Sequence, residues 1–366
     1  RFLPEGGRLG FVLSQAALEA GYWEGLRRFL AERANVLAVV SSPAERWFAD
    51  AAIHGVIVIL ERRTNGASPR PLARFARLGV PMVDAAARVR GLADLDVVAE
   101  VRALGGAEAW LSPWAPLVRA PDAWFAASRE AGGLLVPLVE LCDVNLGVTS
   151  GANKFFYMTR EEAKRREIET CFLAPVLRSP RAAPAIHADP LRLATVAFVC
   201  DLAPDALGKY PGAAAYVEAN GALELRPMLA TRKRWWSLPV RLARLFLAKT
   251  YDSRFVQPLS PTPLLADQRV YMAHPRGVDL ELLAATLNGT LTALAIESLG
   301  RASLGDGALE WSVGDIRRLP VLDVRAIERS PAAGVVREAF RALARRPIGT
   351  VDREATALDR QVLDRA

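Results

Sequence analysis

The stretch Asp143–Thr159, with the sequence DVNLGVTSGANKFFYMT, organises our interpretation of the whole chain. Small and flexible residues lead into the polar pair Asn153-Lys154, and an aromatic run begins at Phe155. A regular strand tolerates two such closely spaced glycines poorly unless the backbone bends or another group approaches it. We therefore predict a hinge strand and loop that face a ligand. The alternative is an ordinary β-hairpin with core aromatics, because these residue types are common at turns.

The composition is that of a globular chain with sizeable cores. Of the 366 residues, 51% are hydrophobic and 24% are charged, and the length suits roughly two domains. No apolar run approaches the ~20 residues of a membrane-spanning helix, so we expect no membrane partner. The chain opens at Arg1 on what reads as the end of a helix, and we expect it to be a fragment of a longer reading frame.

The formal net charge of +7, with Arg far outnumbering Lys, favours a polyanionic partner, most simply nucleic acid. The alternative is a coding bias that replaces Lys by Arg. The three cysteines and three histidines are scattered along the sequence (Cys142, Cys171, Cys200, His54, His187 and His274). Their spacing predicts neither a metal site nor a disulfide framework, which fits a reducing cytoplasm.

The first sixty residues read as a sheet with helical cover. Arg8–Ser14 predicts a strand buried on both faces, Ala16–Arg33 a helix, and Val36–Ser41 a second buried strand. The third strand, Ile53–Leu60, follows a loop rather than a helix, which favours antiparallel pairing at a sheet edge. Farther on, the Pro- and Trp-rich segment Trp110–Phe125 is expected to pack onto a neighbouring domain.

Basic residues and tryptophans alternate within Arg226–Arg244, whose sequence includes RKRWW. Arg and Lys bind phosphates, and aromatic or guanidinium planes stack on bases, so the segment suits a nucleic-acid surface. The alternative is a solvated basic turn with Trp235 and Trp236 in the core. Asp279 then predicts the start of one amphipathic helix that Gly300 ends. A charged helical tail closes the chain.

Taken in order, these segments resemble the C-terminal portion of adenine-specific (N6) DNA methyltransferases of the restriction-modification and phage-defence type. No single motif is decisive, but their order extends over some three hundred residues. The matching segments are GGRLGFVLS (Gly6–Ser14), EGLRRFLAE (Glu24–Glu32), RWFADAAIHGVIVILER (Arg46–Arg62), GVTSGANKFFYMT (Gly147–Thr159), FLAPVLRSPR (Phe172–Arg181), RWW (Arg234–Trp236) and the long run Leu287–Asp323.

The resemblance implies an α/β region with a partial Rossmann-like methyltransferase sheet, followed by an α+β target-recognition domain and a helical tail. The implied boundaries are residues 1–62 for the end of the methyltransferase domain, 63–130 for a connector or helical insertion, 131–325 for the recognition domain and 326–366 for the tail.

The activity implied by the resemblance is methyl transfer from S-adenosylmethionine to the N6 amine of an adenine flipped out of double-stranded DNA. In this family an Asn/Asp-Pro-Pro-aromatic loop holds the amine, and a glycine-rich loop holds the cofactor. This sequence contains no Asn-Pro-Pro or Asp-Pro-Pro, and no Gly-x-Gly fingerprint in a strand-loop-helix context. We therefore expect both loops upstream of Arg1, in an N-terminal catalytic portion, no catalytic or metal-binding residue in this span, and no methylation by the chain alone.

The resemblance places a base pocket at the junction loop and DNA contacts in the recognition region. Leu146 occupies the position where the family has an aromatic that packs on the flipped adenine, so either an apolar wall suffices or Phe155 or Phe156 serves. The predicted pocket and loop residues are Leu146, Gly147, Thr149, Gly151, Asn153, Lys154, Phe155 and Phe156. The predicted DNA contacts are Arg178, Arg181, Arg232, Lys233, Arg234, Trp235 and Trp236.

Three other interpretations remain open at this level. In the first, the chain is a standalone specificity module that acts with a separate catalytic chain. In the second, it is the product of a defunct gene. In the third, it is an unrelated α/β enzyme whose basic charge reflects a coding bias. The strand Arg8–Ser14 argues against the standalone module, because it would be left with an open edge. An Asn-Pro-Pro-aromatic motif upstream in the parent gene would favour the methyltransferase.

Overall fold

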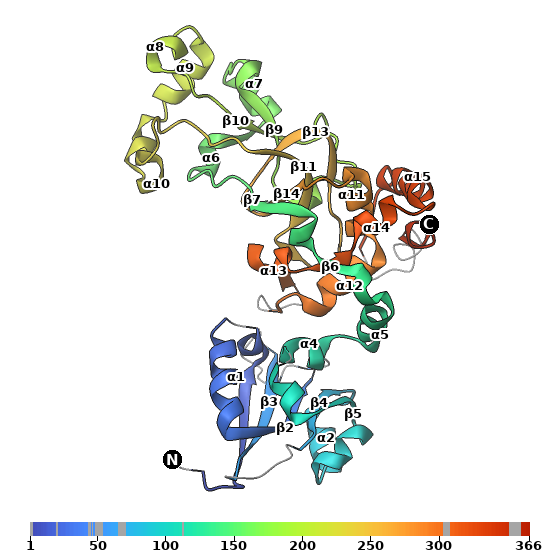
Figure 1. Cartoon of the computed structure of the whole chain (residues 1–366). Helices are drawn as coiled ribbons and strands as arrows, with labels where there is room; N and C mark the ends of the chain where they lie inside the picture. The colour runs from blue at the N-terminus through green and yellow to red at the C-terminus, as the bar shows by residue number, and fades with distance from the viewer. Residues whose placement is uncertain are drawn as a thin grey trace. The chain divides into compact units, whose positions relative to one another are not determined.

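The computed structural model describes residues 3–19, 21–42, 45, 47, 54–64, 71–111, 113–302, 308–350 and 360–366. The chain divides into two compact units (Figure 1). Unit 1 comprises Arg1–Glu130 and Leu294–Glu310, and unit 2 comprises Ala131–Ala293 and Trp311–Ala366. Parts of four sequence segments discussed above lie outside the described residues: most of 46–53, 65–70, 303–307 and 351–359.

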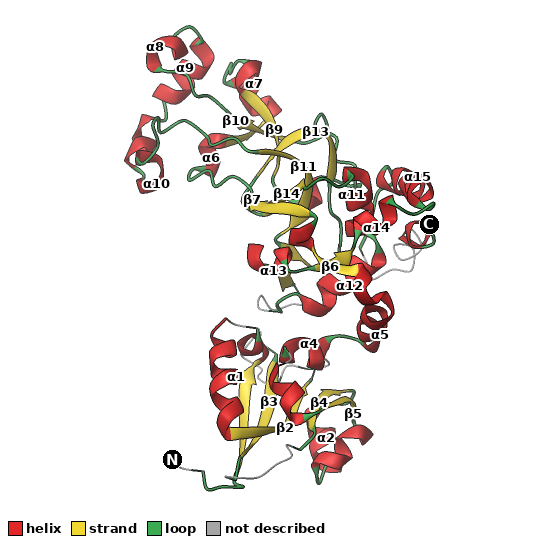
Figure 2. Cartoon of the chain, in the orientation of Figure 1, coloured by secondary structure: helices red, strands yellow, loops and turns green. Residues whose placement is uncertain are grey.

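Unit 1 is built on a five-stranded mixed sheet with the order β1-β3-β2-β4-β5 (Figure 2). β3 runs antiparallel to both of its neighbours, whereas β2 and β4 are parallel. The predicted antiparallel pairing of the third strand is therefore confirmed, but its predicted edge position is wrong, because it lies between the two earlier strands. The strands are β1 (Arg8–Ser14), β2 (Ala34–Ser41), β3 (Gly55–Arg62), β4 (Ala73–Leu78) and β5 (Ala99–Leu104).

The prediction that Arg8–Ser14 is buried on both faces is wrong. β1 is the edge strand of its sheet, and the side chains of Leu9, Phe11 and Val12 are 43%, 54% and 49% exposed. An apolar sequence does not bury an edge strand by itself, because such a strand has a neighbour on one side only. The edge of the sheet at β1 is thus open in this chain, and it is apolar.

Helices cover both faces of the unit 1 sheet. Trp114 is fully buried at the centre of one face, in edge or tilted contact with Trp23, Phe75 and Trp110. The Trp-rich segment therefore packs onto the sheet of its own unit, whereas we expected it to pack onto a neighbouring domain. Apolar side chains of the segment between β4 and β5 cover the other face. The helices are η1 (Gln15–Leu18), α1 (Gly21–Arg33), α2 (Met82–Arg88), η2 (Leu92–Val97), α3 (Gly106–Leu111), α4 (Trp114–Arg119) and α5 (Asp122–Ala131).

Unit 2 contains a seven-stranded sheet with the order β7-β14-β11-β13-β9-β10-β8. Its neighbours are antiparallel except for the pair β13 and β9, which is parallel. The strands are β7 (Cys142–Leu146), β8 (Tyr157–Thr159), β9 (Leu173–Leu177), β10 (Thr195–Phe198), β11 (Leu242–Ala248), β13 (Leu259–Ala266) and β14 (Val270–Pro275). The shorter strands of unit 2 are β6 (Leu135–Pro137), β12 (Thr250–Tyr251) and β16 (Pro320–Leu322), and β15 (Leu309–Glu310) belongs to the second segment of unit 1.

Short helices gather beside the β8–β10 end of this sheet and form a small lobe, drawn in green to yellow in Figure 1. Their apolar side chains enclose an aromatic core that includes Phe155, Phe198 and Tyr216. The elements of the lobe are α6 (Asn153–Phe156), α7 (Arg160–Arg165), η5 (Thr170–Phe172), α8 (Pro204–Leu207), α9 (Pro211–Glu218), η7 (Gly221–Leu225) and α10 (Pro227–Ala230). The lobe carries most of the predicted site residues.

The predicted long helix after Asp279 is two helices. Asp279 does cap the first, because its carboxylate accepts from the Leu282 N–H at 2.8 Å. The helix ends at Gly289, whose backbone is extended, and the Asn288 amide is held by the backbone of Gln257. The helices here are η3 (Gly132–Leu134), η4 (Leu138–Glu140), η6 (Pro180–Ala182), α11 (Leu280–Asn288), α12 (Thr290–Leu299), α13 (Val313–Arg317), α14 (Val324–Glu328) and α15 (Ala333–Ala344).

Among the described residues, no single helix is long and apolar enough to cross a membrane. In this part of the chain, α11 and α12 are long and apolar enough only when they are taken together, and they are bent relative to each other. Most of α11 is buried within unit 2.

Candidate nucleic-acid interface

The junction stretch leaves the sheet at Gly147, directly after the edge strand β7. A Cβ atom at this position would lie 2.2 Å from the Asp267 carbonyl oxygen, so only glycine fits. The Gly147 and Val148 N–H groups donate to the carbonyl oxygens of Val270 and Ala266 at 2.9 and 2.7 Å. The close approach that the sequence predicted is therefore present, but the approaching group is the backbone of the β13–β14 turn. Leu146 pairs with Tyr271 and is 42% exposed.

Gly151 is the second glycine of the junction and has a φ of +73°, a left-handed conformation that favours glycine. A Cβ atom there would lie 2.9 Å from the Met228 sulfur, so α10 packs directly over this turn. Arg226 reinforces the contact by donating to the Gly151 carbonyl oxygen at 3.2 Å. The junction loop and α10 thus form one structural element.

Asn153 and Lys154 begin the single-turn helix α6 and are both exposed. The Ser150 hydroxyl donates to the Asn153 Oδ1, and it also accepts from the Ala152 N–H at 3.3 Å. Asn153 therefore completes a local turn, whereas the Lys154 ammonium is presented to solvent.

Phe155 and Phe156 point into the core of the lobe and are 2% and 0% exposed. The Phe155 ring stacks on Tyr216 with a centroid distance of 4.9 Å and contacts Trp235 at 5.0 Å. Neither phenylalanine offers a face to a base in this arrangement. Trp235, which we predicted to contact DNA, is also buried, so the alternative interpretation as a core residue holds for it.

Arg232 joins the RKRWW segment to the junction loop. Its guanidinium donates to the carbonyl oxygens of Ser237 and Ser150, both at 2.9 Å, and to that of Thr149 at 3.2 Å. It also lies 5.2 Å from the centroid of the Phe156 ring. Burial lowers the pKa of the guanidinium, as expected where desolvation disfavours the charge. The predicted phosphate contact is thus a structural clamp.

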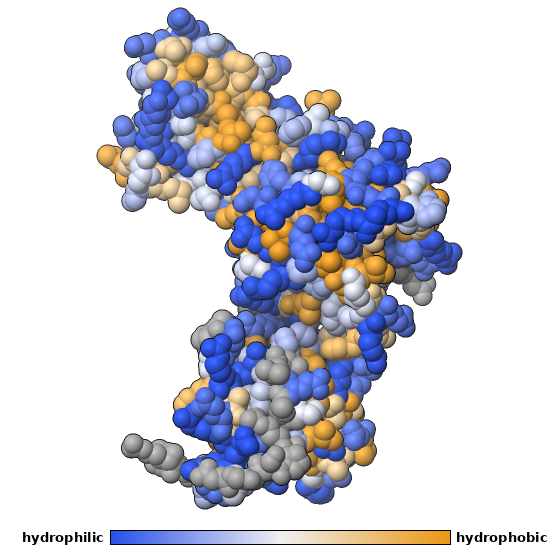
Figure 3. All heavy atoms as spheres, viewed as in Figure 1, coloured by the Kyte–Doolittle hydropathy of each residue, from blue (hydrophilic) through white to orange (hydrophobic). Residues whose placement is uncertain are grey.

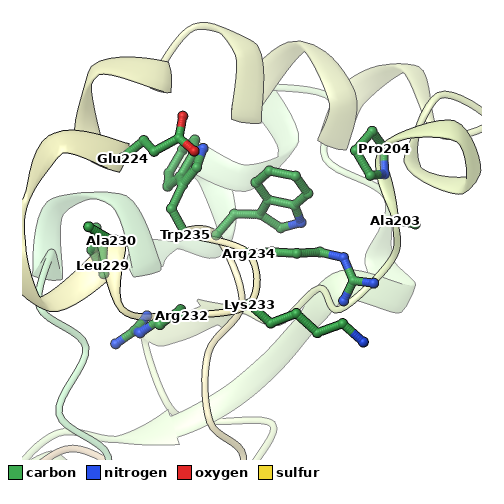
Figure 4. A pocket seen from close by; sticks show the side chains of 10 residues that line it. Ala203, Pro204, Glu224, Leu229, Ala230, Arg232, Lys233, Arg234 and Trp235 are labelled. Atoms are coloured by element: carbon green, nitrogen blue, oxygen red, sulfur yellow. The ribbon is translucent and has the colours of Figure 1, made fainter.

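Arg234 is ion-paired with Asp201 at 2.8 Å, and its side chain is only 17% exposed. Lys233, between the two arginines, is exposed, and its side chain extends beside that of Arg234 (Figure 4). Trp236 is half-buried. These residues surround a cavity of about 300 Å³ that is also lined by Ala203, Pro204, Glu224, Leu229, Ala230, Arg232 and Trp235. The cavity therefore has apolar walls, a cationic rim and one carboxylate.

Arg178 and Arg181 lie on other parts of unit 2. The Arg178 guanidinium lies over the ring of Tyr157 at 5.1 Å. Arg181, on η6, forms an ion pair with Asp252 and remains 74% exposed. Of the seven predicted DNA contacts, Arg232 to Trp236 gather at one cavity, and these two arginines do not line it.

A buried polar pair beside the junction escaped sequence analysis. Asp267 is 1% exposed, and one of its oxygens accepts from the N–H and Nε of Arg269 at 3.1 and 3.2 Å. Tyr157 is also buried, and burial together with the nearby Asp267 charge raises the pKa of its hydroxyl. Tyr157 on β8 thus lies near two residues of the β13–β14 turn, and no spacing in the sequence indicates this.

The residues that the structure describes contain no group of three or more His, Cys, Asp or Glu side chains that could hold a metal ion. The cavity beside Trp236 and the exposed loop cations instead suit an anionic ligand with flat apolar groups.

The fold resembles that of solved restriction-modification enzymes. The type IIL restriction-modification enzyme MmeI, solved in complex with DNA, is 12% identical with a TM-score of 0.56, covering 98% of this chain and 46% of that one. The type IIG restriction endonuclease BpuSI is 12% identical with a TM-score of 0.48, covering 99% of this chain and 47% of that one. The chain thus spans less than half the length of either structure.

The family model for the C-terminal domain of the type II methyltransferase M.Eco57I matches residues 126–354, and the chain belongs to this family. The resemblance of the sequence to type II methyltransferases is therefore confirmed at the level of the family, and the fold of the chain is similar to that of a solved restriction-modification enzyme. A comparison with curated proteins found no match.

Proposed function

We propose that this chain recognises and positions double-stranded DNA for a methyltransferase that modifies the N6 amine of adenine. The observation that carries the proposal is the loop surface of the unit 2 lobe. Lys233 and Trp236 border an apolar cavity there, and Lys154 is presented from the adjoining junction loop. Proteins bind the DNA backbone with cations that contact phosphates, and they hold individual bases with aromatic side chains that stack on them.

The proposal assigns different roles to the predicted cations. Arg232 and Arg234 are held by partners within the lobe, so they shape the surface. Lys154 and Lys233 are exposed and available to phosphates. Trp236 is the candidate for stacking, because its neighbour Trp235 is in the core.

We also propose that the open edge of the unit 1 sheet pairs with a strand of an N-terminal catalytic portion. β1 exposes Leu9, Phe11 and Val12 along an edge strand, a surface that soluble proteins usually cover or interrupt with charge. In this arrangement the sheet of unit 1, to which residues 63–130 contribute β4 and β5, completes a Rossmann-like methyltransferase sheet, while 131–325 recognise DNA and 326–366 form a supporting tail. The three free cysteines suit a reducing cytoplasm as the place of action.

The sequence offers neither the Asn/Asp-Pro-Pro-aromatic loop nor a strand-loop-helix glycine-rich fingerprint. The residues of this chain therefore do not fit S-adenosylmethionine by themselves, and we assign the cofactor and the transfer step to the catalytic portion.

Charge reversal on the lobe tests the DNA-binding role. The chain is titrated with a fluorescently labelled duplex, and Lys154→Glu with Lys233→Glu is compared with Arg88→Glu with Arg129→Glu, an equal charge change on exposed residues of unit 1. We expect the first pair to weaken binding by roughly tenfold more than the second, because two phosphate contacts become repulsive. Equal losses would mean that only net charge matters, and would contradict the proposed surface.

A methyl-transfer assay tests the division of labour. The chain alone, incubated with DNA and tritiated S-adenosylmethionine, is expected to incorporate no label. The protein that includes the catalytic portion is expected to label adenine at N6. Label transferred by the chain alone would place a catalytic loop within these 366 residues and overturn the assignment.

A further inference from the structure

One surface of the lobe is apolar where a soluble protein is normally polar. Leu225 is 86% exposed and Met228 is 49% exposed. Three further small apolar residues of the same short segment are exposed: Ala222, Pro227 and Ala230. We call these five residues the apolar tip. Figure 3 shows apolar atoms on the outer end of the lobe, over α10.

The apolar tip is held firmly from beneath. Leu229 is fully buried and anchors α10 in the aromatic core. The backbone of the preceding turn is closed by bonds from the Leu223 and Arg226 N–H groups to Asn220 and Leu223, both at 3.0 Å. The side chain of Arg226 is in turn bonded to the junction loop. A well-supported turn therefore presents a nearly bare leucine, whose burial against a partner would be favourable.

Charge around the apolar tip indicates what covers it. Arg226 is exposed between Leu225 and Pro227 in the sequence, and Lys233 is exposed on the adjoining cavity rim. Glu224 is the acidic neighbour and lines the cavity. An apolar surface bordered by cations complements a ligand with a negatively charged outside and an apolar interior. Duplex DNA has both, because its phosphates lie outside its stacked bases.

Resting on the DNA-binding function proposed above, we propose that Leu225, supported by Met228, inserts between base pairs of the bound duplex. Leucine and methionine are among the residues that wedge into DNA and partly unstack a base step. The wedge compensates for stacking lost when a nucleotide leaves the helix, and the cations of the lobe hold the flanking phosphates. The apolar tip thus serves to open the duplex rather than to read its sequence.

The test compares two duplexes of the same sequence, one intact and one with a single abasic site, in binding to the 366-residue chain. The abasic site removes part of the unstacking cost, so a wedge binds it more tightly. We expect a preference of roughly tenfold for the wild-type chain, because the abasic duplex spares part of the cost of unstacking one step. Leu225→Ala is expected to remove most of this preference.

Leu191→Ala is the matched control, because Leu191 is 81% exposed on another loop of unit 2. The control should keep the preference, and both variants should keep the melting temperature of the wild type, since neither side chain is packed. Equal preference in wild type and Leu225→Ala, or no preference in the wild type, would overturn the wedge while leaving DNA binding intact. Failure of the wild type to bind either duplex would overturn both proposals.

Discussion

Arg232 holds the fold of the lobe, in contrast to the exposed cations that we propose to contact DNA. Its guanidinium makes three hydrogen bonds to backbone carbonyl oxygens, at 2.9, 2.9 and 3.2 Å. A hydrogen bond from a charged donor contributes about 1.5–3 kcal/mol, less where water can replace the donor. The side chain is partly exposed, so we discount the sum. Arg232→Ala is then expected to lower the free energy of unfolding of unit 2 by about 2–4 kcal/mol.

The measurement is thermal unfolding, combined with hydrogen exchange at the junction loop. For a unit of some two hundred residues, each kcal/mol shifts the melting temperature by about 2–4 °C, so the variant should melt roughly 4–16 °C lower. Exchange should accelerate at Thr149 to Phe156. Lys233→Ala, one residue away and exposed, should change stability by less than about 0.5 kcal/mol but weaken DNA binding.

The opposite pattern would refute this reasoning. Unchanged melting of Arg232→Ala, with a loss of DNA affinity equal to that of Lys233→Ala, would show that Arg232 contacts phosphate. Arg232→Lys gives a further check, because it keeps the charge but not the planar fork that reaches several carbonyls. A clamp predicts partial loss of stability, whereas a phosphate contact predicts near-normal behaviour.

Further predictions concern the glycines, the thiols and one surface ion pair. Gly147→Ala should abolish or strongly weaken folding of unit 2 in a denaturation experiment, because its Cβ would lie 2.2 Å from backbone, whereas Gly334→Ala, which has open space on α15, should be neutral or stabilising. Burial raises the pKa of the Cys142 thiol to about 12, so thiol titration at neutral pH should label the exposed Cys171 and reach Cys142 only after unfolding. The hydrogen bond from Arg276 lowers the pKa of the Asp143 carboxyl below its value in the unfolded chain. The ion pair therefore stabilises the fold at pH values above the unfolded carboxyl pKa, and this stabilisation is lost as the pH falls through the folded pKa. Asp143→Asn should therefore make the melting temperature decline less steeply on the acid side.

Local chemistry made several features predictable. Two glycines as close as Gly147 and Gly151 indicated that another group approaches the backbone here, because a regular strand tolerates them poorly. In the structure, the Asp267 carbonyl group approaches Gly147. Asp279 has the side chain and position of a helix cap, and it caps. In both cases a short range of sequence determines the conformation.

Features that depend on distant neighbours were not predictable in the same way. The sequence of Arg8–Ser14 is apolar, but its burial depends on which strands flank it, and β1 has one neighbour. The RKRWW segment reads as five DNA contacts, yet partners as distant as Ser150 and Asp201 occupy two of its arginines. The proximity of Tyr157 and Asp267 depends on how the strands are ordered in the unit 2 sheet. Tertiary contacts therefore decide which polar residues remain available to a ligand.

The most direct test of the account is the affinity of the chain for duplex DNA across a salt series. Each phosphate neutralised contributes a slope of about −0.9 to the logarithm of the binding constant against the logarithm of salt concentration. We predict a steep slope for the wild type, reduced by about one in Lys233→Ala and unchanged in Leu191→Ala. Absent binding at low salt, or an affinity that does not change with salt, would contradict the claim that this chain holds DNA.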